Sequence, residues 1–167
     1  MKKQVEQYVR DYGLALTKLC VSLTDNRHDA EDLYQSTWEK VIRKLRKYDS
    51  SRPFEKWLFA VCVNTYRDRV RRYDNHKLLR FPSVEEQERF LSSIPCEDGD
   101  RDEYLSLHSA VRQLKPPLRE AIVLYYFRDY SVAELSEILK IPEGTVKSRL
   151  SAARAELRKE LKDDEEQ

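Results

Sequence analysis

The chain has 167 residues, of which 40% are hydrophobic and 37% are charged, and its formal net charge at pH 7 is +1. This length suits one domain or two small ones, and the composition excludes a single large hydrophobic core. No apolar run approaches the roughly 20 residues that cross a bilayer, and the charged N-terminal segment lacks a signal-peptide core, so the sequence predicts a cytoplasmic protein without membrane insertion.

The charges are arranged in blocks along the chain. Residues 40–80 carry many more Lys and Arg than Asp and Glu, whereas residues 82–104 and 163–167 are acidic. Such asymmetry is typical of a protein that binds a polyanion with one segment and keeps another segment solvated or in a masking role. A soluble helical protein with charged faces is the plainer alternative.

Apolar residues at helical spacing predict three helices in the first half of the chain. The first covers about 3–23 and the second about 28–48, with a polar turn between them. The second has acidic residues in its first turn and basic residues in its last turn, which suits the helix dipole at both ends. After a further turn, Pro53 suits the first position of a third helix that continues to about Arg72.

The middle of the chain differs in composition. Residues 82–103 are acidic, contain prolines and a glycine, and lack a sustained apolar period, so they are predicted to form a linker with one short helix around 84–91. The apolar period resumes at Tyr104. Pro116-Pro117 is expected to end the helix that begins there, and a further helix follows over about 118–125.

The segment 131–161 predicts a helix-turn-helix. Ser131 and Glu134 have the spacing of a capping box, which begins a short helix. A tight turn follows at 140–144, and a longer basic helix begins near Thr145. The inward stripe of this helix consists of Val146, Leu150, Ala153, Leu157 and Leu161. The fold class expected is all-α, with two small helical domains joined by an acidic linker and the helix-turn-helix at the C-terminal end.

The polar faces of the long helix favour DNA binding. Early residues of a recognition helix reach base edges in the major groove, and later basic residues meet phosphates. The residues predicted to contact DNA are Thr145, Lys147, Ser148, Arg149, Ser151, Arg154 and Arg158, with the last two at phosphates. An amphipathic helix with a solvated basic face is the alternative, and the capping box and the short turn favour DNA binding over it.

The cysteines and histidines predict neither a metal site nor a disulfide framework. Cys20, Cys62 and Cys96 are odd in number and far apart, and the first two lie in apolar helical stretches where buried free thiols are expected. The three histidines have no partners at metal-ligand spacing. Without a nucleophile–base pair or a phosphate-binding loop, the sequence predicts no catalytic residue, no cofactor and no enzymatic activity.

Motifs in both halves of the chain point to one family. The first half contains DAEDLYQ at 29–35, FEKWL at 54–58 and VNT at 63–65, and a basic run follows. The second half contains GTVKSR at 144–149 and AAR at 152–154. Together, and in this order, they resemble domains two and four of the extracytoplasmic-function sigma factors of bacterial RNA polymerase. The resemblance implies four segments, which are domain two at 1–80, a linker at 81–103, domain four at 104–162 and an acidic tail at 163–167.

The resemblance implies a role for each domain. Domain two docks on core RNA polymerase, and the implied docking residues are Glu31, Asp32, Leu33, Gln35 and Glu39. It also melts the downstream promoter element, and the residues implied to contact that element are Lys56, Asn64, Arg67 and Arg71. Domain four binds the upstream element through the long helix. The partners implied are core RNA polymerase, double- and single-stranded promoter DNA and a cognate anti-sigma factor.

Aromatic side chains near the downstream-element segment are candidates for stacking on a base. In the family, the turn that corresponds to 48–54 receives a flipped base. Trp57 lies at helical spacing with apolar neighbours, so it is predicted to belong to the core, while Tyr48, Tyr66 and Tyr73 are the candidates for exposed aromatic residues.

Two rival functions stay open. A free-standing helix-turn-helix regulator would bind duplex sites tightly by itself, commonly as a dimer, but it leaves the DAEDLYQ helix unexplained. An interaction adaptor would use the bundle only to bind proteins, and it would tolerate the replacement of Lys147, Arg149 and Arg154.

Overall fold

The computed structural model describes residues 1–76 and 101–165 of the chain. All regular secondary structure in these two stretches is helical, which confirms the predicted all-α fold class. None of the helices described is both long and apolar enough to cross a membrane. The expected linker helix at 84–91 lies outside the described residues. The chain divides into two compact units, unit 1 (Met1–Arg80) and unit 2 (Phe81–Gln167).

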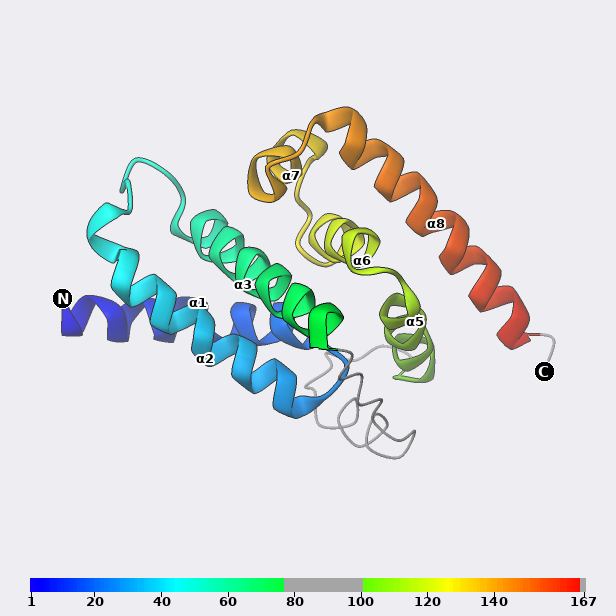
Figure 1. Cartoon of the computed structure of the whole chain (residues 1–167), viewed down its shortest axis with the longest axis horizontal. Coiled ribbons are helices and arrows are strands. Elements are labelled where there is room, and N and C mark those ends of the chain that lie inside the picture. The colour runs from blue at the N-terminus through cyan, green and yellow to red at the C-terminus, as the bar shows by residue number, and fades with distance from the viewer. Residues whose placement is uncertain (77–100, 166–167) are drawn as a thin grey trace. The chain divides into compact units, whose positions relative to one another are not determined.

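Unit 1 is a bundle of three helices, α1 (Lys2–Leu23), α2 (Arg27–Lys44) and α3 (Phe54–His76), in which each helix contacts the other two. In Figure 1, α1 and α2 run in opposite directions and α3 lies beside them. The predicted polar turn separates α1 from α2, and Asn26 caps α2 by accepting a hydrogen bond from the amide of Asp29. The apolar side chains with no exposed surface in this core are Leu16, Leu23, Leu33, Leu58, Phe59, Cys62 and Val63.

The end of α2 differs from the prediction. The helix stops at Lys44 and a short 3-10 helix, η1 (Leu45–Lys47), follows where the sequence predicted continued α-helix to residue 48. A loop then leads to α3, which begins one residue after Pro53. The Pro53 carbonyl accepts the amide of Trp57 at 3.4 Å, so the proline precedes the helix and does not occupy its first position.

Unit 2 contains α5 (Arg101–Gln113), α6 (Pro116–Ile122), a π-helical segment η2 (Val123–Phe127), α7 (Val132–Leu139) and α8 (Glu143–Glu165). The prolines begin α6, where a missing amide costs nothing, and α5 has already ended three residues before them. The buried apolar core includes Leu114, Ile122, Leu124, Leu135, Leu139, Val146, Leu150 and Ala153. Leu157 and Leu161, which the inward stripe predicted, are only half-buried.

The helix-turn-helix has the predicted capping box. The Ser131 hydroxyl accepts the amide of Glu134 at 3.2 Å, and the Glu134 carboxylate accepts the amide of Ser131 at 2.9 Å. After α7 the chain turns at Lys140, which adopts a left-handed conformation with φ 54°. Helix α8 then begins at Glu143, two residues before the predicted start, so Gly144 lies inside the helix.

Candidate nucleic-acid interface

The polar stripe of α2 is exposed, as its helical spacing requires. Glu31, Gln35 and Glu39 are exposed, and the side chain of Asp32 is 42% exposed. Leu33 differs, because it has no exposed surface and belongs to the core of unit 1. A side chain in that position holds the helix in the bundle and cannot contact a docking partner, so the implied contact role of Leu33 is wrong.

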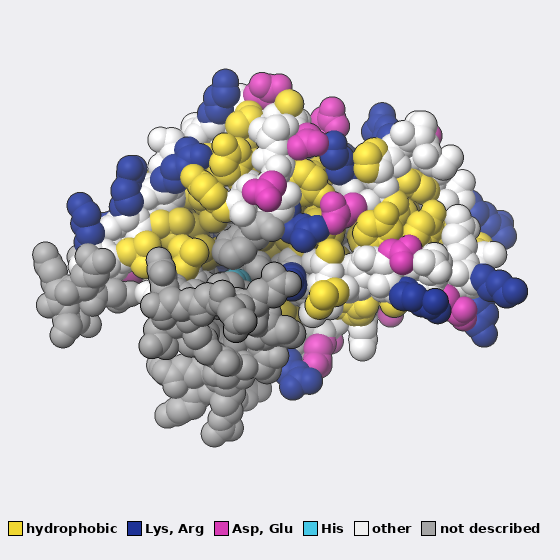
Figure 2. Space-filling view, turned by 180° about the vertical axis from the view of Figure 1, so that it is seen from behind, with side chains coloured by type: hydrophobic (Ala, Val, Ile, Leu, Met, Phe, Trp, Pro, Cys, Tyr) yellow, Lys and Arg dark blue, Asp and Glu magenta, His cyan; other side chains and the backbone are white. Residues whose placement is uncertain are grey.

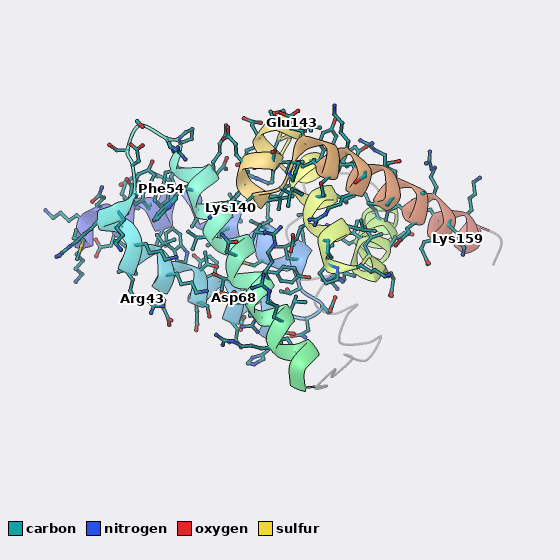
Figure 3. The ribbon with its side chains drawn as sticks, turned by 45° about the horizontal axis from the view of Figure 1, so that its top comes forward. Arg43, Phe54, Asp68, Lys140, Glu143 and Lys159 are labelled. Carbon is teal, nitrogen blue, oxygen red and sulfur yellow. The ribbon has the colours of Figure 1, made fainter. Side chains whose placement is uncertain are left out.

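The four candidates on α3 lie on one stripe of that helix. Lys56, Asn64 and Arg67 are half-exposed and Arg71 is exposed, while Leu58 and Val63 face the core. Figure 3 labels Phe54 at the start of α3 and Asp68 further along the same helix. The stripe therefore presents three cations and one amide along a single helix, and this combination suits the backbone and base edges of a nucleic acid strand.

Aromatic rings gather beneath the loop that connects α2 to α3. Tyr8 stacks on Phe54 with ring centroids 3.8 Å apart, and Tyr48 lies 4.8 Å from the ring of Trp57. The Tyr48 hydroxyl donates a hydrogen bond to the carbonyl of Arg52, which closes the loop. Burial raises the pKa of Tyr48 above its ordinary value, and the neighbouring tyrosines and Asp49 add to the effect.

The four aromatic residues considered in and around α3 differ in how far they are exposed. Trp57 is half-buried, so it is neither a core residue nor an open stacking platform. Tyr48 is also half-buried, and Tyr73 is 39% exposed. The prediction of an exposed Tyr66 is wrong, since this side chain is only 6% exposed on the inward face of α3.

Helix α8 exposes most of the side chains that the sequence assigned to DNA. Lys147, Ser148, Ser151 and Arg158 are exposed, and Thr145 and Arg149 are half-exposed. Val146, Leu150 and Ala153 face the core on the opposite side. Figure 3 labels Lys140 and Glu143 on the two sides of the turn that leads into α8. The start of α8 therefore carries polar side chains next to a tight turn, as in helices that enter the major groove.

Arg154 has a structural partner that the sequence did not reveal. Its Nε donates a hydrogen bond to the Tyr126 hydroxyl at 2.6 Å, and its guanidinium lies 5.5 Å from the ring centroids of both Tyr125 and Tyr126. Both tyrosines belong to the π-helical segment η2. Arg154 thus joins η2 to α8.

Buried ionisable residues hold α5 and α6 together. Arg119 donates hydrogen bonds to the carbonyl of Arg112 and, at 3.3 Å, to the carbonyl of Leu114. His108 is 2% exposed, and burial followed by the charge of Arg112 lowers its pKa to about 4. The Arg119 hydrogen bonds close the end of α5, and the lowered pKa of His108 keeps its imidazole neutral at pH 7. Within the part of the chain that the structure describes, no group of three potential metal ligands occurs.

Part of the charge in the basic block at residues 40–80 is used in ion pairs within unit 1. Figure 2 shows Lys and Arg side chains dispersed among acidic and hydrophobic ones on its visible face. In unit 1, interhelical ion pairs use part of this charge. Lys40 Nζ lies 3.0 Å from Asp68 Oδ2, and a guanidinium nitrogen of Arg69 lies 3.1 Å from Asp29 Oδ1. A basic block in the sequence therefore overstates the charge available to a ligand.

Comparison with known proteins gives the family of both units. Residues 8–76 match the family model of sigma-70 region 2, and residues 104–157 match that of sigma-70 region 4. The ECF RNA polymerase sigma factor SigW of Bacillus subtilis is 33% identical over 160 residues, which cover 91% of this chain and 86% of SigW. SigE of Mycolicibacterium smegmatis is 31% identical over 160 residues, which cover 92% of this chain and 60% of SigE.

Solved structures agree with this assignment. The sigma factor RpoE of Bartonella quintana, in complex with the anti-sigma factor NepR, has a TM-score of 0.76 and 28% identity, with 96% of this chain and 98% of that chain covered. CnrH in complex with the cytosolic domain of CnrY has a TM-score of 0.70 and 26% identity, with 98% and 91% covered. The chain therefore belongs to the extracytoplasmic-function family of RNA polymerase sigma factors, which bring core polymerase to specific promoters and start transcription there.

Proposed function

We propose that this sigma factor docks on core polymerase through the exposed polar stripe of α2, formed by Glu31, Asp32, Gln35 and Glu39. This stripe carries three carboxylates and one amide, which suit a basic partner surface. Leu33 lies directly behind it in the core and fixes the helix. A docking surface on a packed helix presents its charges with little loss of backbone freedom on binding.

We assign contact with the downstream promoter element to Lys56, Asn64, Arg67 and Arg71 of α3. The alignment of the four side chains along the solvent side of one helix supports this assignment. The helix begins next to the loop at residues 48–53, where the ring of Tyr48 lies against that of Trp57. Cations along such a stripe attract the phosphates of a strand, and the Asn64 amide can both donate to and accept from a base edge. Catalysis remains with the polymerase, since a sigma factor is not an enzyme.

We assign contact with the upstream element to the start of α8. The residues proposed for this duplex contact are Thr145, Lys147, Ser148, Arg149, Ser151, Arg154 and Arg158. The capping box of α7 and the left-handed turn at Lys140 support the assignment, because they fix the angle at which α8 leaves the turn. For Arg154 we propose a phosphate contact by the guanidinium end, with Nε held by Tyr126.

The proposed domain boundaries follow from the same assignments. They are domain two at 1–80, a linker at 81–103, domain four at 104–162 and an acidic tail at 163–167. The protein is proposed to act in the cytoplasm, where its polymerase and promoters are. A cognate anti-sigma factor is proposed as a further partner, because the similar RpoE structure contains the anti-sigma factor NepR.

Reconstituted transcription tests the docking proposal. The purified chain is added to the core polymerase of its host together with a library of the host's promoters, and new start sites are mapped. We expect discrete start sites that disappear when Asp32 and Gln35 are both replaced by Ala, while Lys18→Ala on α1 leaves them unchanged. Start sites that persist in the double variant would overturn the docking assignment.

Binding of the isolated chain to core polymerase and to duplex DNA distinguishes the sigma factor from the alternative function. A free-standing regulator predicts no binding to core polymerase and tight binding of the isolated chain to duplex sites. The sigma factor predicts weak DNA binding by the isolated chain and strong binding in holoenzyme, because two moderate contacts on one scaffold reinforce each other.

A further inference from the structure

The two aspartates of the DAED segment, Asp29 and Asp32, have different surroundings. Asp29 lies in the first turn of α2 and makes contacts inside unit 1, where its Oδ2 accepts from the Asn26 amide group at 2.7 Å. Its Oδ1 accepts from Arg69 at 3.1 Å and from the Tyr73 hydroxyl at 3.2 Å. Asp29 therefore joins the start of α2 to the C-terminal half of α3.

Arg69 connects this internal residue to the proposed docking residue. The same guanidinium nitrogen that lies 3.1 Å from Asp29 Oδ1 lies 3.7 Å from Asp32 Oδ2. The Arg69 side chain is only 18% exposed, whereas that of Asp32 is 42% exposed. One partly buried cation thus contacts two carboxylates that are three residues apart on the same helix.

We infer that Arg69 is a positioning residue that holds the carboxylate of Asp32 in place for docking on core polymerase. The inference rests on the proposed docking role of Asp32. Aspartates three residues apart on a helix repel each other, and a guanidinium between them removes that repulsion. The Arg69 ion pair of Asp32 and the 3.4 Å contact of Asp32 with His28 Nε2 both end on Oδ2, so docking through Oδ1 breaks neither contact.

The position of Arg69 on α3 adds a second consequence. Arg67 and Arg71, two of the residues proposed to contact promoter DNA, are its close neighbours along the helix. Tyr73, one turn further on, also donates to Asp29. The cluster of Asp29, Asp32, Arg69 and Tyr73 therefore fixes the proposed DNA-contacting part of α3 relative to the proposed docking stripe of α2.

A second ion pair in the same bundle supplies a matched control. Lys40 Nζ lies 3.0 Å from Asp68 Oδ2 and also joins α2 to α3, with side chains 28% and 46% exposed. Neither residue contacts Asp32 or belongs to the proposed surfaces. Loss of this pair weakens the same helix–helix contact without changing the surroundings of the docking carboxylate.

The test measures the affinity of the full chain for core polymerase by competition with a labelled wild-type chain, alongside thermal unfolding of each variant. We expect Arg69→Met to weaken binding about fivefold, which corresponds to about 1 kcal/mol, while Lys40→Met changes it less than about twofold. In an Asp32→Asn background, Arg69→Met should have less than about half of this effect in free energy, because the two residues act through one contact.

The outcomes separate positioning from simple stabilisation. Equal losses of affinity for Arg69→Met and Lys40→Met, or an Arg69 effect that is undiminished in the Asp32→Asn background, would overturn the inference. If Arg69→Met fails to fold, the cycle is measured with Arg69→Lys, which keeps the charge but loses the planar fork. A loss of affinity for Arg69→Lys that needs Asp32 supports the inference, and no loss overturns it. Should Asp32→Asn alone leave the affinity unchanged, the docking assignment itself fails, whatever Arg69 does.

Discussion

The cap of α7 allows a sharp test of how the helix-turn-helix is held. Helix α7 has only eight residues, which is too short to be stable alone in water. Its first turn depends on the Ser131 hydroxyl, which accepts the amide of Glu134 at 3.2 Å. Ser131→Ala removes this acceptor and should lower the free energy of unfolding of unit 2 by about 1 kcal/mol, whereas Ser131→Thr keeps an oxygen in place and should cost less.

The distribution of tryptophans provides the assay. The chain has two, Trp38 and Trp57, and both belong to unit 1, whereas circular dichroism reports the helices of both units. The free energy of unfolding falls by about 1–3 kcal/mol per molar urea, so a loss of about 1 kcal/mol in that free energy lowers the urea concentration at the unfolding midpoint of unit 2 by about 0.5 M. We expect Ser131→Ala to shift the circular dichroism transition and to leave the tryptophan fluorescence transition in place.

Two results would refute this reasoning. An unchanged circular dichroism transition would show that the cap contributes nothing to α7. An equal shift of the fluorescence transition would show that the two units unfold as one. The Ser131→Thr variant is the internal control, because a shift as large as that of Ala would point to the loss of something other than the capping oxygen.

Three further predictions concern buried side chains. Leu33→Ala should destabilise unit 1 by about 2–5 kcal/mol, seen in the tryptophan transition, and Gln35→Ala should not, since only Leu33 is in the core. Folding lowers the pKa of His108 to about 4, so below about pH 6.5 the unfolded chain binds a proton at this residue that the folded chain does not bind. Unit 2 should therefore lose stability as the pH falls from about 6.5 to 5. In urea titrations at several pH values, His108→Gln should reduce this dependence of the free energy of unfolding on pH. Burial, followed by the hydrogen bond and charge of Cys62 at 3.8 Å, raises the pKa of Cys20 well above 9.0, so folded protein keeps a proton that the unfolded chain loses. Stability should therefore hold below pH 9 and fall above it, less so in Cys20→Ala.

Local patterns in the sequence predicted much of the fold. Residues close together in the chain determine three of these features, so the sequence alone predicts them. They are the polar turn that ends at Asn26, the capping box at Ser131 and the apolar periods of the helices. The docking role that the resemblance implies for Leu33 comes from its motif and not from the place of Leu33 on the helix. The helical period alone places it opposite Glu31 and Gln35, on the buried face.

Features that depend on distant residues could not be read in the same way. The left-handed turn falls on Lys140, although Gly144 nearby is the residue that sequence rules favour for such a turn. The contact of Arg69 with Asp29 joins residues 40 positions apart, and only the packing of α2 against α3 brings them together. In a highly charged helical chain, many such pairs are compatible with the sequence, and the register of the helices selects among them.

Arg154 shows why this selection matters for function. Its place on α8 predicts a phosphate contact, because it follows the base-reading turn on the basic side of the helix. The structure adds an interaction with Tyr126 that depends on the π-helical segment, since a π-turn changes the direction of the side chains that follow it. Arg154 therefore joins η2 to α8 and, in the proposed contact, also binds a phosphate, so its replacement tests both roles together. Tyr126→Phe removes the hydrogen bond to Nε but keeps the arginine, so this variant tests the structural role separately.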